Sequence, residues 1–230
     1  MSQAVTVTPH SQLKNIVTDE CMEFLTLLHQ KFNDRRIALL EIRSSRQQLF
    51  DEGYPPSFDL DGENIRKGDW KCAPVPESIL DRRVEITGPP ERKMVINAMN
   101  SGAKVYMADF EDSSSPTWNN MIEGQVNLRD AVDGSITYEH PMKGTYKLNE
   151  SPAVLFVRPR GLHLEEKNFL VDDKRTSGAL FDFGVFIFNS GKILEGDGRG
   201  PYFYLPKLED SAEAKWWADV FRFAEEYLEI

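Results

Sequence analysis

Short apolar segments alternate with helical patterns throughout residues 84–230, and this alternation constrains the fold more than any other feature. Each apolar segment is followed by a stretch in which apolar residues recur at helical spacing. Strands that are apolar on both faces and are joined through helices indicate a parallel sheet covered by helices. The four apolar segments are residues 84–88, 104–109, 153–158 and 202–206.

A parallel sheet of this kind is either open or closed into a barrel. A complete (β/α)₈ barrel takes roughly 250 residues, and residues 84–230 leave room for about four βα units. The predicted fold class is therefore α/β, with an open sheet or half of a barrel. Residue counting alone leaves both alternatives open.

Residues 1–76 are predicted to form an α-helical domain and its linker. A first helix is expected to begin after Thr18, whose hydroxyl can cap it, and to break at Asn33-Asp34. A second helix is expected to run on to Gly53. Prolines and glycines then interrupt any periodicity up to residue 76, which is typical of a linker.

Residues 77–230 are predicted to form a second domain that contains the sheet. Two segments interrupt its strand–helix alternation. Residues 135–148 have the pattern of a β-hairpin, and a smaller hairpin is expected around Asp172-Asp173. Loops after βα steps tolerate such insertions.

Charge and composition exclude several classes of function. The formal net charge is −10, which disfavours binding to nucleic acid. No apolar run approaches the ~20 residues that a membrane span needs, so no membrane partner is expected. The two cysteines, Cys21 and Cys72, have no metal-ligand spacing and suggest a reducing compartment.

Polar side chains collect where the predicted strands end, at residues 109–112, 158–160 and 207–210. The carboxyl ends of parallel strands share one edge of the sheet, where active sites are built. Strand alternation would also send Arg158 and Arg160 to the same side. Carboxylates with arginines and a lysine are typical of a site that holds a small anion together with a divalent cation.

Glu111, Arg158 and Lys207 are expected to project from this same edge. Arg158 directly follows an apolar strand, where an unpaired charge is costly, so a role in function or in a charged network is expected. His163 is expected near the edge in a structural role. The chain has neither a GxGxxG turn nor a P-loop lysine motif, so a nucleotide-binding function lacks support.

Five segments closely resemble the A-type malate synthases, in register from the N-terminal helices to the last residue. The resemblance implies a TIM barrel between two helical domains, and hence that this chain is its first half, a partial barrel of about four βα units. The segments are residues 81–89, 104–113, 124–132, 157–164 and 200–209.

The resemblance also implies an activity, the condensation of acetyl-CoA with glyoxylate and water to malate and CoA in the glyoxylate cycle. Its metal is Mg²⁺. Arg158 falls on the family's catalytic arginine, which would stabilise the enolate and orient the aldehyde. Glu111 falls on an acidic position that contacts substrate near the outer shell of the metal. The implied location is cytoplasmic or peroxisomal (glyoxysomal).

The chain departs from that family in length. Family members are roughly twice as long, since a ~250-residue barrel is only one of their domains. Their direct Mg²⁺ ligands and base aspartate lie in later segments, so no metal ligand and no activity are expected in this chain, which resembles a truncated fragment. Two alternatives stay open, a CoA-thioester lyase of the citrate lyase β type and a non-catalytic fragment.

Overall fold

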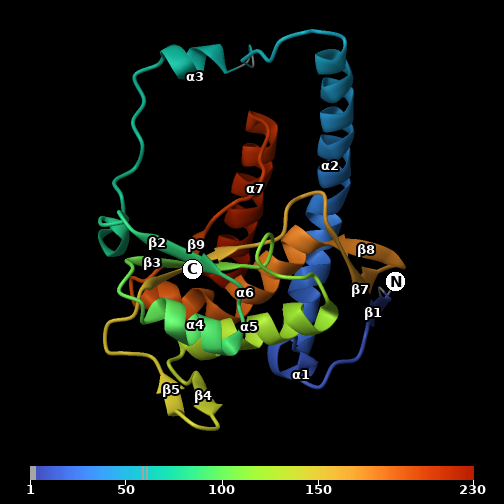
Figure 1. The fold of residues 1–230 in the computed structure, drawn as a ribbon. Coiled ribbons are helices and arrows are strands. Elements are labelled where there is room, and N and C mark those ends of the chain that lie inside the picture. Colours follow the sequence, from blue (N-terminus) through green and yellow to red (C-terminus); the bar gives the residue numbers. More distant parts are fainter. Residues whose placement is uncertain (1–3, 59, 61) are drawn as a thin grey trace.

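A four-stranded parallel sheet forms the centre of the molecule (Figure 1). The computed structural model describes residues 4–58, 60 and 62–230. The strand order β2-β3-β6-β9 follows the sequence, and each neighbouring pair is parallel, as predicted. The strands are β2 (Glu85–Gly88), β3 (Val105–Asp109), β6 (Val154–Arg158) and β9 (Tyr202–Phe203).

Each strand of this sheet is followed by a helix later in the chain. Three of these helices begin with a side-chain cap: Thr117, Ser177 and Asp210 accept the backbone N–H three residues further on. A buried apolar cluster between the sheet and the helices includes Tyr106 and Leu155. The helices are α4 (Arg92–Met99), α5 (Trp118–Val132), α6 (Gly178–Gly196) and α7 (Ser211–Leu228).

The N-terminal region contains a short helix, α1 (Leu13–Ile16), and one long helix, α2 (Asp19–Asp51). Thr18 caps α2 as predicted, by accepting the N–H of Cys21. The predicted break at Asn33-Asp34 is wrong. Helix interiors tolerate Asn and Asp at a cost of about 0.7 kcal/mol each, and here the buried Asn33 accepts a hydrogen bond from Arg36, one turn along the same helix.

Helix α2 packs against both α6 and α7 through a second apolar cluster. Its buried members include Phe24, Leu25 and Leu28 from α2 and the adjacent pair Trp216-Trp217 from α7. The indole of Trp216 donates to the carbonyl of Phe32 on α2. Figure 1 shows α2 and α7 running beside each other on one side of the sheet.

The described residues between α2 and β2 (52–58, 60 and 62–84) belong to a long connection that returns to β2 at the far side of the sheet (Figure 1). It contains α3 (Glu63–Lys67) and the 3₁₀ turn η1 (Glu77–Ile79). Ile79 packs beneath the sheet against Val105, Met107 and Phe156. Several large apolar side chains of the connection are exposed: Tyr54, Phe58, Leu60, Ile65, Trp70 and Val75.

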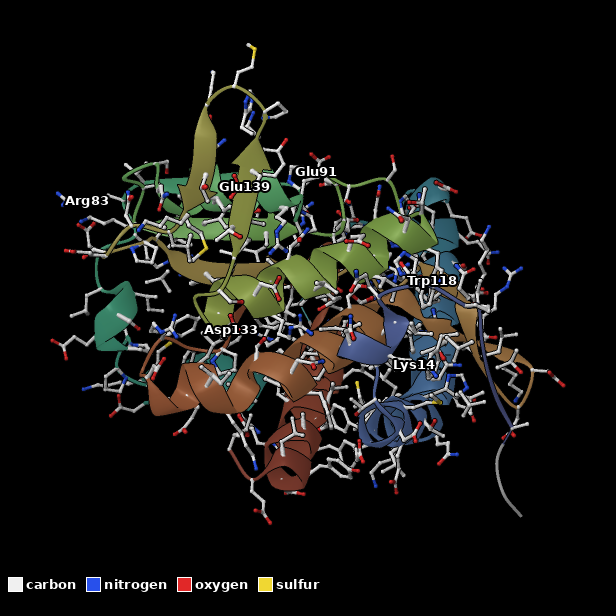
Figure 2. The ribbon with its side chains drawn as sticks, turned by 90° about the horizontal axis from the view of Figure 1, so that it is seen from below. Lys14, Arg83, Glu91, Trp118, Asp133 and Glu139 are labelled. Carbon is white, nitrogen blue, oxygen red and sulfur yellow. The ribbon has the colours of Figure 1, made fainter. Side chains whose placement is uncertain are left out.

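Two antiparallel sheets flank the parallel one. The predicted hairpin is formed by β4 (Thr137–His140) and β5 (Gly144–Lys147), and it projects from the body of the molecule (Figures 1 and 2). The smaller predicted hairpin is formed by β7 (Glu165–Val171) and β8 (Lys174–Ser177). Strand β1 (Val5–Val7) adds to its edge, which the sequence did not predict.

The segment after β1 lies along α5. Trp118 donates from its indole to the carbonyl of Thr8, and Arg129 donates to the carbonyl of Asn15. Figure 2 shows α1, which carries Lys14, beside α5 near Trp118. Among the described residues, no helix is both long and apolar enough to cross a bilayer.

Candidate active site

The loop after β3 is organised by one buried carboxylate, that of Asp109. Its oxygens accept the backbone N–H groups of Glu111, Asp112 and Ser113 at 2.9, 3.1 and 3.0 Å, and the Ser113 hydroxyl at 2.7 Å. Local turns of this type use the short side chain of Asp in place of a backbone acceptor. Asp109 therefore holds the next two acidic side chains at the carboxyl end of the sheet.

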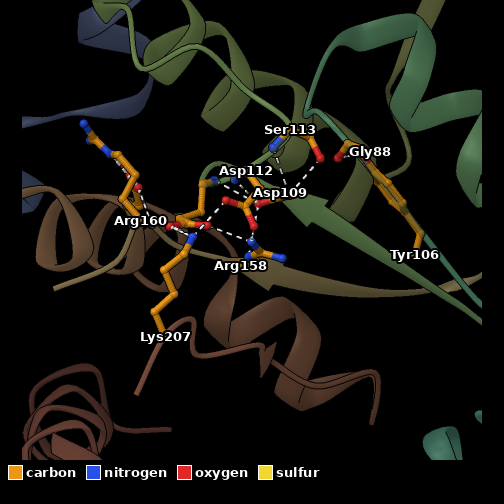
Figure 3. A network of polar contacts seen from close by, with 10 residues as sticks. Gly88, Tyr106, Asp109, Asp112, Ser113, Arg158, Arg160 and Lys207 are labelled. Atoms are coloured by element: carbon orange, nitrogen blue, oxygen red, sulfur yellow. Dashed lines mark hydrogen bonds and ion pairs between the residues drawn. The ribbon is translucent and has the colours of Figure 1, made fainter. Parts of the chain in front are cut away.

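Arg158 ends β6, the next strand of the sheet, and its side chain meets that loop (Figure 3). Its Nη2 donates to Glu111 Oε2 at 2.7 Å and to the Asp112 carboxylate. Its Nε lies 3.4 Å from Asp109 Oδ1, and among the described residues this buried nitrogen makes no hydrogen bond. The guanidinium is thus surrounded by all three carboxylates of the loop.

Lys207 approaches the same carboxylates from the loop after β9. Its ammonium bonds to the Glu111 carboxylate and lies 2.8 Å from Asp112 Oδ1. Glu111 is buried, whereas Asp112 and Lys207 are largely exposed. The prediction that Glu111, Arg158 and Lys207 project from the same end of the sheet is confirmed, because the two cations share both carboxylates.

Each charged group in this cluster favours the charged form of its neighbours. Hydrogen bonds from Lys207, as the largest cause, and from Arg158 hold the pKa of Asp112 well below its ordinary value. Burial would lower the pKa of Arg158, but the hydrogen bond to Glu111 and the charges of Asp109 and Asp112 outweigh it, so that pKa is raised. All three carboxylates of the loop face cations, and Arg158 stays protonated at any physiological pH.

Arg160 does not join this cluster, contrary to the expectation that it lies on the same side as Arg158. It is buried and pairs with Asp182 on α6 and Glu166 on β7. Figure 3 shows its side chain extending away from Arg158. Side chains alternate between the two faces of a sheet only within a strand, and β6 ends at Arg158, so this rule does not place Arg160. Arg160 therefore links the loop to the helix layer.

His163 lies near the site without bonding to it. The imidazole sits against Gly161, where an added Cβ would lie 2.7 Å from His163 Cε1 and 3.6 Å from Glu111 Oε1. Gly161 therefore lets the histidine and the glutamate come close on one side of the loop. His163 is exposed to solvent.

Helix α2 also contributes to the surroundings of the site, which sequence reasoning missed. Arg36 donates to the carbonyl of Leu162 at 2.7 Å, and Arg43 donates to the carbonyl of Lys207 at 2.9 Å. These contacts join residues 126 and 164 positions apart. No local pattern signals them, although the spacing of the two arginines places them on one helix face.

A metal ion is not accommodated by these side chains alone. Oxygen ligands would suit Mg²⁺, but Glu111 and Asp112 are each bonded to both Arg158 and Lys207. In the part of the chain that the structure describes, no group of three or more His, Cys, Asp or Glu side chains is placed to hold a metal.

Comparison with known proteins identifies the family to which this chain belongs. The family described as "Malate synthase, N-terminal domain" matches residues 4–60, and "Malate synthase, TIM barrel domain" matches residues 154–230. Malate synthase of Myxococcus xanthus (strain DK1622) is 50% identical over 221 residues, which cover 96% of this chain and 41% of that protein. The chain belongs to the malate synthase family.

Other members of the family are equally similar to this chain. Malate synthase A of Escherichia coli (strain K12) is 50% identical over 215 residues, 94% of this chain and 40% of that protein. The glyoxysomal malate synthase of Brassica napus is 50% identical over 214 residues, 91% of this chain and 38% of that protein. The chain thus corresponds to the N-terminal portion of a malate synthase and spans about two fifths of its relatives' length.

Proposed function

We propose that the protein to which this sequence belongs is a malate synthase that condenses acetyl-CoA with glyoxylate and water, giving malate and CoA in the glyoxylate cycle. The observation that carries the proposal is Arg158, which ends a buried strand and whose guanidinium is held at the carboxyl end of the sheet by Glu111 and Asp112. The family membership supports this reaction, and Arg158 supplies a group suited to it.

Arg158 is the proposed catalytic residue. Removal of a proton from the thioester methyl leaves an enolate, and a fixed guanidinium stabilises a developing oxygen anion without reorganising. The same planar group can bind the carboxylate of glyoxylate through two parallel hydrogen bonds. Because its neighbours raise its pKa, Arg158 acts through its charge and donors rather than as a base.

Glu111 is proposed as a second substrate-binding residue beside Arg158. Its two oxygens bond to different cations, Oε2 to Arg158 and Oε1 to Lys207. A carboxylate held in this way orients the guanidinium, since rotation of Arg158 would break a hydrogen bond of 2.7 Å. Glu111 therefore determines which donors of Arg158 face the substrate.

Mg²⁺ enters the proposal as the cation that the family uses. Because Glu111 and Asp112 are bonded to Arg158 and Lys207, the direct ligands are assigned to later segments of the full-length protein, and Glu111 to the outer shell. Residues 1–76 are proposed as the helical domain and linker, and residues 77–230 as the first half of the barrel.

The location proposed for the full-length protein is cytoplasmic or peroxisomal (glyoxysomal). The relative from Brassica napus carries the word glyoxysomal in its name. Acetyl-CoA and glyoxylate are the proposed partners, and neither nucleic acid nor membrane is among them.

The proposal is tested by replacing Arg158 in a chain extended to the length of the relatives. Arg158→Lys keeps the charge but removes the planar fork, and we expect the rate of CoA release to fall by roughly 10²–10³-fold, as when an oxyanion donor is lost. Arg83→Lys is the matched control, because Arg83 is exposed and pairs only locally with Asp81. It should leave the rate unchanged.

The readout is the glyoxylate-dependent appearance of the CoA thiol. A near-normal rate for Arg158→Lys would contradict the catalytic assignment. CoA release that does not require glyoxylate would instead point to another thioester-cleaving reaction, and no release from an extended, folded wild-type protein would contradict the proposed function itself.

A further inference from the structure

Three arginines of α2 reach the loops that carry the candidate site. Arg36, Arg43 and Arg46 stand seven and three residues apart, and this spacing places them on one face of the helix. Arg36 contacts the loop after β6, and the other two contact the loop after β9. Helix α2 therefore touches the two loops that follow β6 and β9, next to which Arg158 and Lys207 lie.

Arg43 makes the most complete of these contacts. Its Nε and Nη2 bind the two oxygens of Glu213 at 2.6 and 2.9 Å, a two-pronged pair with a fully buried carboxylate. The same Nη2 donates to the carbonyl oxygen of Lys207 at 2.9 Å. Through this one guanidinium, the first turn of α7 and the backbone of Lys207 are held at a fixed separation.

The backbone at Lys207 needs such support. Its φ is +52°, in the left-handed region that costs a residue with a side chain about 1 kcal/mol or more. Two further bonds hold the loop that follows: Glu209 donates its N–H to Glu213 Oε2 at 2.8 Å, and Asp210 accepts the N–H of Glu213 at 2.9 Å. Glu213 and Arg43 together thus restrain the turn on both sides.

This turn directs the Lys207 side chain back over the sheet edge. Figure 3 shows it extending toward the loop after β3, where its ammonium meets Glu111 and Asp112. A lysine side chain has four rotatable bonds, so its ammonium stays at these carboxylates only if its backbone is fixed. The carbonyl that Arg43 binds belongs to that backbone.

We propose that Arg43 is a positioning residue of the candidate active site, which holds the left-handed turn at Lys207 and thereby keeps the Lys207 ammonium on Glu111 and Asp112. The inference rests on the proposed function only in one respect, namely that the site is a catalytic one. The coupling from α2 to Lys207 is a property of this chain, and it can be measured without any activity.

The experiment measures how fast the Lys207 amine is acetylated by N-hydroxysuccinimidyl acetate at fixed pH, with Lys143 as the internal reference. Lys143 is exposed at the tip of the β4–β5 hairpin, far along the chain from Arg43. Peptide mass spectrometry gives the ratio of the two rates. Arg43→Gln should raise that ratio about fivefold, the factor that corresponds to losing one typical hydrogen bond.

Arg43→Lys serves as the second variant, in case the neutral one does not fold. It keeps a charge opposite Glu213 but loses the fork that also reaches the Lys207 carbonyl, so the ratio should rise here too. Arg35→Gln is the matched control. It breaks another pair between α2 and α7, Arg35 with Asp219 at 2.6 Å, and it should leave the ratio unchanged.

An unchanged ratio in a folded Arg43 variant would overturn the proposal. So would an equal rise in Arg35→Gln, because that result would show general loosening of α7 instead of a specific contact. A failure of the proposed function would appear elsewhere, in the CoA-release assay of the extended protein, and would leave this ratio unaffected.

Discussion

Arg160 and Asp182 form an ion pair that is closed off from solvent. Nε and Nη2 of the arginine each lie 2.8 Å from an oxygen of the aspartate, which also accepts the backbone N–H of Arg160 at 2.9 Å. The two side chains are 2% and 0% exposed. The pair ties the loop after β6, and with it the position of Arg158, to helix α6.

Removing one partner of this pair should destabilise the fold strongly. Asp182→Asn leaves the buried Arg160 with Glu166 as its remaining carboxylate, and breaking a buried pair typically costs about 3–5 kcal/mol. Urea unfolding followed by circular dichroism measures the loss. Asp197→Asn is the control at the exposed end of the same helix, where about 0–1 kcal/mol is expected. A loss below about 1 kcal/mol for Asp182→Asn would contradict the structural role.

The contact between α2 and α6 depends on a glycine. A Cβ added at Gly184 would lie 2.6 Å from Leu25 Cδ2 and 2.9 Å from Leu28 Cδ1, and both leucines are fully buried. Gly184→Ala should therefore lower the free energy of unfolding by about 1–3 kcal/mol. Gly196→Ala, at the end of the same helix, meets nothing within 4 Å and should change it by less than about 0.5 kcal/mol. Equal unfolding midpoints for the two variants would contradict the close packing.

Stability should depend on the protonation of His29. Burial, as the largest cause, lowers its pKa below the ordinary 6.5, although Asp34 opposes the shift. The folded state therefore binds fewer protons than the unfolded state. The contribution of neutral His29 to the free energy of unfolding is complete above about pH 6.5 and is lost as the pH falls below that value. We expect a lower urea midpoint at pH 5.5 than at pH 7.5.

The matched variant for this pH effect is His29→Gln, which cannot titrate and should reduce the difference between the two pH values. His163→Gln changes an exposed histidine and should keep the wild-type difference. If His29→Gln retains the full difference, groups other than His29 are responsible for the pH dependence.

The chain as it stands should release no measurable CoA from acetyl-CoA and glyoxylate. Arg158 and Glu111 are in place, but among the described residues no group of three or more potential ligands is placed to hold a metal ion, and a guanidinium cannot remove the methyl proton. The measurement is the thiol assay with and without Mg²⁺, at equal concentrations of this chain and of the extended protein. Comparable rates would show that the later segments are dispensable.

Much of the sheet and its polar edge was predictable because both follow from local patterns. Continuous apolar strands joined by helices can form a parallel sheet in sequence order, and that topology brings the ends of β3, β6 and β9 together. The meeting of Glu111, Arg158 and Lys207 follows from those two facts. Neither inference requires knowledge of distant contacts.

The features that the sequence did not predict depend on contacts between distant segments. Asn33 reads as a helix breaker until its burial and its bond to Arg36 are known. The three residues of β1 are too few to predict a strand, and they pair with residues 169–171. The partners of Arg160 and Arg43 lie on other elements, so no spacing in the sequence reveals them.

The separation of Arg43 from Lys207 also has a consequence for the order of events during synthesis. The two residues are 164 positions apart. At ribosomal rates, Lys207 is therefore added to the chain roughly ten to thirty seconds after Arg43. For most of that time α6 and α7 have not been made, so the apolar face of α2 that they later cover lacks both helices. A nascent malate synthase therefore exposes a long, half-apolar helix while the helices that bury it are still being made, and a chaperone can bind it during that time.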